Sequence, residues 1–427
     1  MKDMKFTVVA TGDSFIVKRI QDKNLGGITD VFKDADAVFT NLETTVHNYE
    51  DDCYPMCKPK GDWGRASVDC ICDMKDAGIN LYGLPNNHTY DFMENGVLRT
   101  IENLNSVGAL NAGTGKNLFE ASKPVYLDSP NGRIALIAFS TTFVGFQRAG
   151  EQRRDMVGRP GMFTIGHDTY FKVTAEELQT MKNIESRNYW DGIGMRSEIM
   201  EDRIKYGDVY VVVGEGETET KAHEEDLKRL KNSIEEAKRQ ADLVLTACHS
   251  HECKDYNDFL NPGFLEEIAH FCIDCGADAY MGHGPHVMRG IEIYKDRPIF
   301  YSMGNLFYEC ELLDRAPEDM YGAYPGLEKK DSIADIYDFR EIDGALGEND
   351  PNFFQAVVGK FVIDDGKLEN VDIYPIDLQL EAHRSTKGTP VMAKGRVAEE
   401  VKSKIQELSA PYGTEIIFED GVGRVSL

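Results

Sequence analysis

Short apolar runs alternate with amphipathic helical patterns through most of the chain. Strands are predicted within residues 5–13, 36–43, 80–88, 132–140, 208–214, 241–252 and 278–286, and helices within residues 96–108, 223–240 and 262–277. Residues 290–305 predict a hairpin that turns at Lys295 and Asp296. Strands that alternate with helices are typical of βαβ units, so the pattern predicts an α/β fold.

Five of the predicted strands end in polar residues. These are Asp13; Asn41 and Glu43; Asn87, His88 and Asp91; His249, His251 and Glu252; and His283 and His286. In open α/β sheets ligands bind beyond the carboxyl ends of the strands, so these clusters can converge on one crevice. Carboxylate, amide and imidazole groups hold divalent metals, and this number of donors can serve two ions.

The two histidine pairs are the strongest of these signals. His249 and His251 lie where a strand becomes a loop, and two charged imidazoles there would repel each other, which a bound metal relieves. His283 and His286 lie in a segment whose tight backbone is fixed by Gly282, Gly284 and Pro285, and a glycine turn with one hydrogen-bonded histidine is the alternative. His88, three residues before Asp91, allows an oriented imidazole.

Two segments interrupt the regular pattern. An insert at about residues 143–207 carries a basic strip at 146–155 and the glycine-rich piece 188–195, and we expect it to determine specificity. Arg148 and Arg153 would bind a substrate carboxylate there, and an exposed loop is the alternative. Residues 309–350 lack periodicity and predict a lid or long loop. Residues 353–381 then predict paired strands that turn at Asp365 and Gly366 and extend the sheet.

Composition excludes several classes of protein. The chain has 427 residues, enough for one large domain or two, and a formal net charge of −26. That charge argues against binding nucleic acid or an anionic membrane, because both are polyanionic. The longest apolar runs fall far short of the roughly 20 residues that a spanning helix needs. No secretory signal is visible and the nine cysteines are an odd number, so we expect a cytoplasmic protein with reduced thiols.

Taken in order, the motifs resemble those of a known family. "TGD", "NLE", "NNHTYD", "HSHE", "GHGPHVMRGIEIY" and "RPIFYSMGN" are similar to the bacterial capsule-synthesis family CapA, the poly-γ-glutamate biosynthesis proteins. The resemblance runs from about residue 6 to 308. It implies a layered fold of the calcineurin-like metallophosphoesterase type, with central β-sheets flanked by helices. Residues 1–310 would form the catalytic domain, and residues 311–427 an extension that completes it.

The resemblance also implies a site. Its metal ligands would be Asp13, Glu43, Asn87, His249, His251, His283 and His286, and the cofactor would be two divalent ions, manganese, zinc or iron. His88, held by Asp91, matches the histidine that meets the reacting group, and Asn41 and Asn305 are expected beside the substrate. Phe15 replaces a histidine of the usual first motif, and "NLE" replaces the usual Gly-Asp-x-x-Asp. The choice of ligand between His283 and His286 stays open.

Three functions remain open from the sequence. The first is hydrolysis of a phosphoester or of a peptide-like amide such as a γ-glutamyl linkage, with His88 or His286 as proton donor. The second is a peptide epimerase, in which Asp13 and His286 remove and return an α-proton from opposite faces. The motif variants resemble those of metal-dependent epimerases from lasso-peptide biosynthesis. The third is a non-catalytic factor of capsule assembly, and the sequence carries no signal for oligomeric state.

Overall fold

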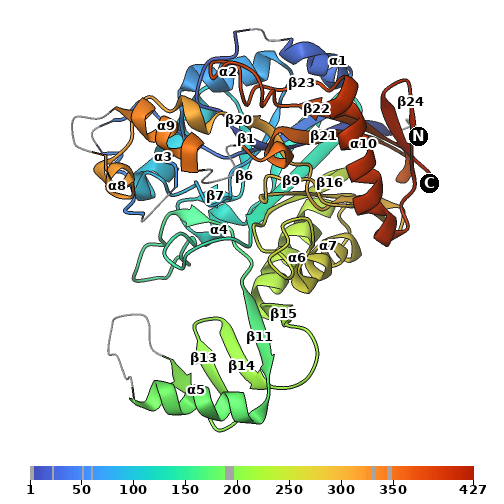
Figure 1. Ribbon diagram of the computed structural model, residues 1–427. Helices are drawn as coiled ribbons and strands as arrows, with labels where there is room; N and C mark the ends of the chain where they lie inside the picture. The colour runs from blue at the N-terminus through green and yellow to red at the C-terminus, as the bar shows by residue number, and fades with distance from the viewer. Residues whose placement is uncertain are drawn as a thin grey trace.

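Two β-sheets packed face to face form the centre of the protein in the computed structural model (Figure 1). The structure describes residues 4–21, 24–50, 52–58, 61–187, 197–324, 326–327, 332–343 and 349–427. The first sheet has the order β24 (Ile416–Glu419), β25 (Val422–Val425), β22 (Lys367–Asp377), β21 (Gln355–Asp364), β1 (Lys5–Phe15), β2 (Ala37–Leu42), β5 (Leu81–Gly83) and β6 (Leu110–Ala112). In addition β20 (Asn305–Tyr308) pairs with β1, and β23 (Val391–Met392) pairs with β22.

The second sheet has six strands and is mostly parallel. Its order is β18 (Ile291–Tyr294), β19 (Arg297–Phe300), β17 (Ala279–His283), β16 (Leu243–His249), β9 (Gly132–Ser140) and β8 (Val125–Ser129). Phe39 of the first sheet packs with Leu136, Leu245 and Met281 of the second in one buried core. Strands buried on both faces read as continuous apolar runs, which explains the uninterrupted "IALIAF" of β9.

Helices cover the outer face of each sheet. On the first sheet lie α1 (Ile28–Phe32), α2 (Val68–Asp76) and α3 (Met93–Ser106), and on the second lie α4 (Leu118–Ala121), α6 (Glu224–Lys238) and α7 (Gly263–Asp274). From α10 (Gly395–Ser409), Val401 and Ile405 pack into the core between the sheets. The predicted α/β fold, with central sheets flanked by helices, is confirmed. No helix in the described parts of the chain has the length and apolar character to cross a membrane.

Both predicted hairpins are confirmed. β18 and β19 pair antiparallel across the turn at Lys295 and Asp296, and β21 and β22 pair across Asp365 and Gly366. Because β21 also pairs antiparallel with β1, the C-terminal hairpin extends the first sheet, as the sequence predicted.

The insert contains a small sheet of its own. Its order is β12 (Glu198–Ile199), β13 (Arg203–Tyr206), β14 (Val209–Val213), β11 (His167–Val173) and β15 (Glu219–Ala222). From α5 (Ala175–Arg187), Leu178 packs on Ile204 and Val211, and the lobe projects from the body (Figure 1). The small sheet continues beyond the predicted end of the insert near residue 207. β11 pairs with both β14 and β15, and these two strands follow that residue. The glycine-rich piece 188–195 lies outside the described residues.

The segment at 309–350 is not only a loop. It contains α8 (Glu318–Gly322) and α9 (Ile333–Asp343), and Met320, Ile336 and Tyr337 are buried in the core outside the first sheet. The sequence predicted a lid or long loop without periodicity here, and it missed these helices because both are short, although Ile333, Ile336 and Tyr337 lie at helical spacing. Arg340 of α9 is fully buried, and its guanidinium donates two hydrogen bonds to Asp62 at 2.7 and 3.2 Å.

One buried histidine belongs to the packing of the first sheet's outer face. His47 is fully buried, with its ring 4.3 Å from the ring of Phe92 and 5.5 Å from that of Tyr49. Its Nδ1 accepts a hydrogen bond from the backbone N–H of Tyr49 at 3.1 Å. Burial lowers the pKa of His47 from 6.5 to about 4.

We expect the protein to lose stability between pH 7 and pH 5, in part because of His47. Its pKa is lower in the folded than in the unfolded protein, so the unfolded chain takes up the proton first as the pH is lowered. The free energy of unfolding therefore decreases toward acidic pH. The His47 share of that fall should be about 2 kcal/mol. Urea denaturation at both pH values should therefore show a smaller fall for His47→Gln. The exposed-site control His383→Gln should behave like the wild type, and an equal fall in all three proteins would contradict the assignment.

Candidate metal centre and active site

The candidate site lies where the carboxyl ends of strands from both sheets meet. Asp13 of β1 is the register partner of Asn41 in β2 and of Asn305 in β20. Across the seam, His249 of β16 is the register partner of His283 in β17. Register partners point to the same face of a sheet, so these two rows of side chains meet between the sheets.

Unusual backbone positions make this meeting possible. A Cβ atom at Gly12 would lie 1.8 Å from the carbonyl oxygen of Gly304, so only glycine lets β20 approach β1 next to Asp13. Gly284 has φ +125°, and a Cβ there would lie 2.6 Å from the backbone nitrogen of Ser250. His286 follows with φ 60°, a left-handed conformation that is uncommon for non-glycine residues. The glycine-bracketed turn thus brings His283 and His286 to the same centre.

Three ligand atoms form a first candidate metal position. Asp13 Oδ1 lies 3.4 Å from Nδ1 of His249 and 3.2 Å from Nδ1 of His283, and the two nitrogens are 3.2 Å apart. Four ligands placed tetrahedrally at 2.0–2.1 Å from an ion are about 3.3–3.4 Å from one another. The triangle therefore has the dimensions that a divalent cation requires.

Glu43, His251 and His286 form a second candidate position next to the first. One ligand atom from each lies within 4.8 Å of the others. Glu43 Oε1 is 3.7 Å from His286 Nε2, and 3.8 Å from Nε2 of His249 in the first group. Three buried atoms here, both carboxylate oxygens of Glu43 and Nε2 of His251, have no hydrogen-bond partner among the described residues. A cation would supply the missing partner, so these residues fit a metal.

The protonation states also suit metal binding. Burial lowers the pKa of His249, His251 and His286, so these imidazoles are neutral, as metal ligands must be. Burial would raise the pKa of Asp13, but its hydrogen bonds to His249 and His283 hold that pKa well below its usual value. Burial and the nearby charge of Asp13 raise the pKa of Glu43 well above its usual value. A cation beside Glu43 would restore its charged form.

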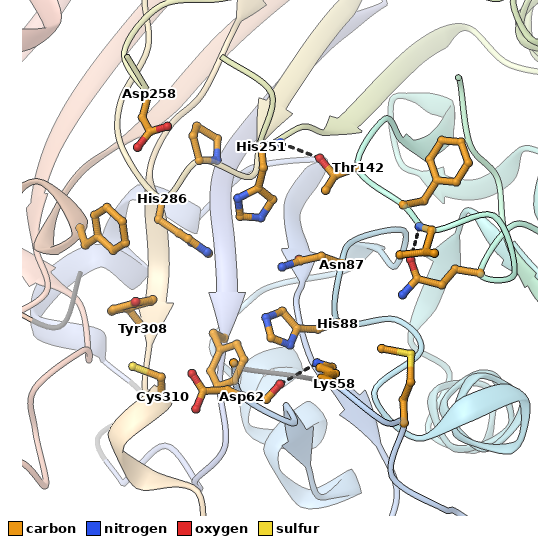
Figure 2. A pocket seen from close by; sticks show the side chains of 18 of the residues that line it. Lys58, Asp62, Asn87, His88, Thr142, His251, Asp258, His286, Tyr308 and Cys310 are labelled. Atoms are coloured by element: carbon orange, nitrogen blue, oxygen red, sulfur yellow. Dashed lines mark hydrogen bonds between the residues drawn. The ribbon is translucent and has the colours of Figure 1, made fainter. Parts of the chain in front are cut away.

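Asn87 and His88 lie beside the two metal positions. Asn87 Oδ1 is 3.1 Å from His249 Nε2. The Nδ1 atom of His88 is 2.7 Å from Asp91 Oδ2, and Figure 2 shows the His88 ring turned toward Asn87 and the cavity. Asp91 is fully buried, pairs with Lys58 through Oδ1, and accepts a hydrogen bond from the backbone N–H of Gly64 at 2.6 Å. The structure therefore joins the predicted pair to a lysine, Lys58, that sequence reasoning missed.

The two asparagines expected beside the substrate hold ligands instead. Asn41 Nδ2 donates to Asp13 Oδ1 at 2.6 Å. Asn305 Oδ1 lies 2.8 Å from His286 Nδ1, and Asn305 Nδ2 donates to the backbone oxygen of Phe353 at 2.9 Å. Such contacts fix the orientation of a ligand and leave the other ring nitrogen, here His286 Nε2, to face the centre.

Glu252 has a similar supporting role that the sequence did not reveal. Its Oε2 accepts hydrogen bonds from the hydroxyls of Thr141, Thr142 and Ser250 at 2.8, 2.9 and 2.9 Å. Thr142 Oγ1 in turn accepts from the backbone N–H of His251 at 2.7 Å. This cluster fixes the turn that carries His251. Thr141 and Thr142 follow β9 and lack a motif of their own.

The two arginines proposed from the sequence to bind substrate lie elsewhere. Both η-nitrogens of Arg148 pair with the buried carboxylate of Asp226 in α6, which anchors the insert to the body. Arg153 is exposed and contacts Asp155 at 3.2 Å. Neither side chain lines the cavity. The guanidinium of Arg148 is occupied by a structural ion pair instead.

A cavity of about 710 Å³ opens above the metal positions. Asn87, His88, His251 and His286 line it from the loops after β5, β16 and β17 (Figure 2). The remaining walls come from the loop at 56–62, the loop after β9, β20 and the turn before β21. Three predicted metal ligands, Asn87, His251 and His286, thus share one opening with His88, whereas the other four are buried.

Known proteins resemble this chain over most of its length. The family model of the bacterial capsule synthesis protein PGA_cap matches residues 7–309. Two uncharacterized proteins of Sinorhizobium fredii, y4sH and y4uA, are each 30% identical over 436 residues, covering 99% of this chain and 93% of theirs. The capsule biosynthesis protein CapA of Bacillus anthracis is 22% identical, covering 71% of this chain and 60% of that protein.

We expect the purified protein to bind two divalent cations, one at each triad. His283→Ala should remove the first ion and His251→Ala the second, because each loses one of three ligands. Elemental analysis after dialysis would count the ions, with the exposed His383→Ala as the matched control. Retention of both ions by the two site variants, or an equal loss in the control, would contradict the assignment.

Asn305 should influence metal affinity without coordinating the metal itself. Asn305→Ala frees the ring of His286, and loss of such an orienting contact lowers metal affinity by about 10–100-fold. Competition with a chelator would measure the affinity for zinc and manganese. The exposed Asn131→Ala should bind like the wild type. Unchanged affinity in Asn305→Ala would show that His286 is held by other contacts.

Proposed function

The chain belongs to the bacterial capsule synthesis protein family PGA_cap, and we propose that it is a metal-dependent hydrolase acting on a phosphoester or a peptide-like amide. One observation carries the proposal. The triad of Asp13, His249 and His283 and the neighbouring triad that includes Glu43 lie under the same cavity as the His88–Asp91 pair. Structural metal sites are closed, whereas the second triad opens through His251 and His286 on a space of substrate size.

The protein's own residues would handle the proton. Divalent cations bound here would lower the pKa of water and polarise the scissile group. Asp91 holds Nδ1 of His88 and so leaves Nε2 to donate a proton to the leaving group. Lys58 pairs with Asp91 and donates to the backbone oxygen of Asp62 at 2.7 Å. These contacts keep the carboxylate of Asp91 in place behind His88.

A peptide epimerase is the second candidate. His88 and His286 enter the cavity from the two different sheets and both point into it (Figure 2). In this reaction His286 would act as acid or base instead of as a metal ligand, so that one imidazole removes an α-proton and the other returns it. The sequence paired Asp13 with His286 in this role. Asp13 does not suit it, because its carboxylate is fully buried and Oδ2 lies 3.8 Å from His286 Nδ1, too close for a substrate carbon between them.

The names of the relatives support a biosynthetic process in which either reaction could take place. Besides the capsule biosynthesis protein of Bacillus anthracis, a probable polyglutamine synthesis accessory protein of Mycobacterium tuberculosis is 23% identical over 279 residues. We infer that this chain acts on a cell-envelope polymer precursor or a peptide. An accessory factor without catalysis is the third outcome that an experiment must separate.

Incubation in deuterated water separates the three functions. Metal-loaded protein is mixed with an aryl phosphodiester, a γ-linked glutamate oligomer and short peptides, and products are followed by mass spectrometry and NMR. Released phosphate ester or glutamate identifies a hydrolase, whereas deuterium at an α-carbon without cleavage identifies an epimerase. Neither product from protein that holds two ions would overturn both enzymatic proposals.

We expect His88→Asn to lower the rate by about 10²–10⁴, the usual contribution of a general acid, and to retain both ions. The matched control is His383→Asn, which should keep the full rate because His383 is exposed and outside the site. A variant that loses metal together with rate would show that His88 serves the metal centre and not the proton.

A further inference from the structure

Aromatic rings flank both imidazoles that could transfer a proton. The ring of Phe15 lies 5.0 Å from that of His88 in an edge-to-face contact. On the other side, the rings of Phe353 and Tyr308 lie 5.6 and 5.4 Å from that of His286. The space next to the reacting atoms is therefore bounded by apolar surface on two sides.

The loop after β9 continues this apolar surface to the mouth of the cavity. Val144 and Phe146 line the cavity, yet 56% and 47% of their surface is exposed. The ring of Phe146 contacts that of Tyr90 only at its edge, with the centroids 6.1 Å apart. Large apolar side chains that remain exposed beside a cavity have a surface left to bury, which a ligand can cover.

Apart from the proposed cations beneath it, the cavity offers little to a negatively charged chain. Among the described residues that line it, Lys58 is the only lysine or arginine, and Asp91 and the backbone of Asp62 occupy its ammonium group. The carboxylate of Asp62 is paired with Arg340. Asp258 adds a further negative charge to the wall, in a protein of formal net charge −26.

We propose that the cavity binds an uncharged apolar group, an aryl or branched alkyl group, attached next to the reacting centre of the substrate. The inference rests on the proposed function and narrows its substrate class. A poly-γ-glutamate chain fits poorly, because each residue carries a carboxylate that would meet apolar walls and an acidic side chain. The apolar group could come from a peptide residue or from the alcohol of a phosphoester.

Equilibrium binding to the metal-loaded protein tests the proposal without requiring turnover. Isothermal titration would compare capped Gly-Phe-Gly with capped Gly-Glu-Gly and a γ-linked glutamate trimer, and phenyl phosphate with glycerol phosphate. We expect the aromatic member of at least one pair to bind about tenfold or more tightly, the usual discrimination of an apolar pocket. The pair that shows the preference identifies the source as peptide or phosphoester.

Phe146→Ser should reduce that preference about tenfold by removing part of the apolar wall. Phe119→Ser is the matched control, since Phe119 is 68% exposed on α4 and does not line the cavity. Tighter binding of the glutamate trimer than of the aromatic probes, or an unchanged preference in Phe146→Ser, would overturn the proposal. An aromatic preference in a protein that neither cleaves nor exchanges would overturn the proposed function and retain the ligand class.

Discussion

The burial of two carboxylates at the seam between the sheets is the constraint on which the rest of this structure depends. Asp13 and Glu43 are fully removed from water, which is costly unless each charge is compensated. Asp13 meets the cost with His249, His283 and the backbone N–H of Gly284 at 2.7 Å, and these contacts fasten β1 of one sheet to β17 of the other. Among the described residues Glu43 has no hydrogen-bond partner, so a cation would stabilise its charged form.

Much of the site could be predicted because most of its residues lie next to strands that the sequence itself reveals. Residues such as Asn41, His249 and His283 follow directly after apolar strands, and parallel strands end at one edge of a sheet. Lys58 escaped because an irregular loop brings it in, and nothing in the sequence near it encodes the partner. Glu252 was placed in a polar cluster, but its partners Thr141 and Thr142 come from another loop. Arg148 was misplaced for the same reason, since its basic neighbourhood was visible but its partner Asp226 lies in a distant helix.

The supporting contacts divide the site into a rigid base and a permissive wall. Asn305, Asp91 and the turn at Gly284 fix each imidazole through hydrogen bonds or backbone geometry. Above them, Phe15 and Phe146 meet their neighbours by ring edges, and their side chains carry no polar atom that a hydrogen bond could fix. Chemistry and ligand choice therefore depend on different parts of the same cavity, so one can change during evolution without the other.

The pairing of β1 with β21 also bears on the order of assembly during synthesis. Residues Lys5–Ala10 pair with Gly359–Asp364, so the first strand of the protein waits for a partner about 350 residues downstream. Until that strand has left the ribosome, residues Lys5–Ala10 present an open edge, whereas Asp13 can already pair with Asn41 of β2 and Asn305 of β20. A ribosome-bound chain that ends after the family-matched region would therefore contain every candidate metal ligand while the first half of β1 is still unpaired on one side.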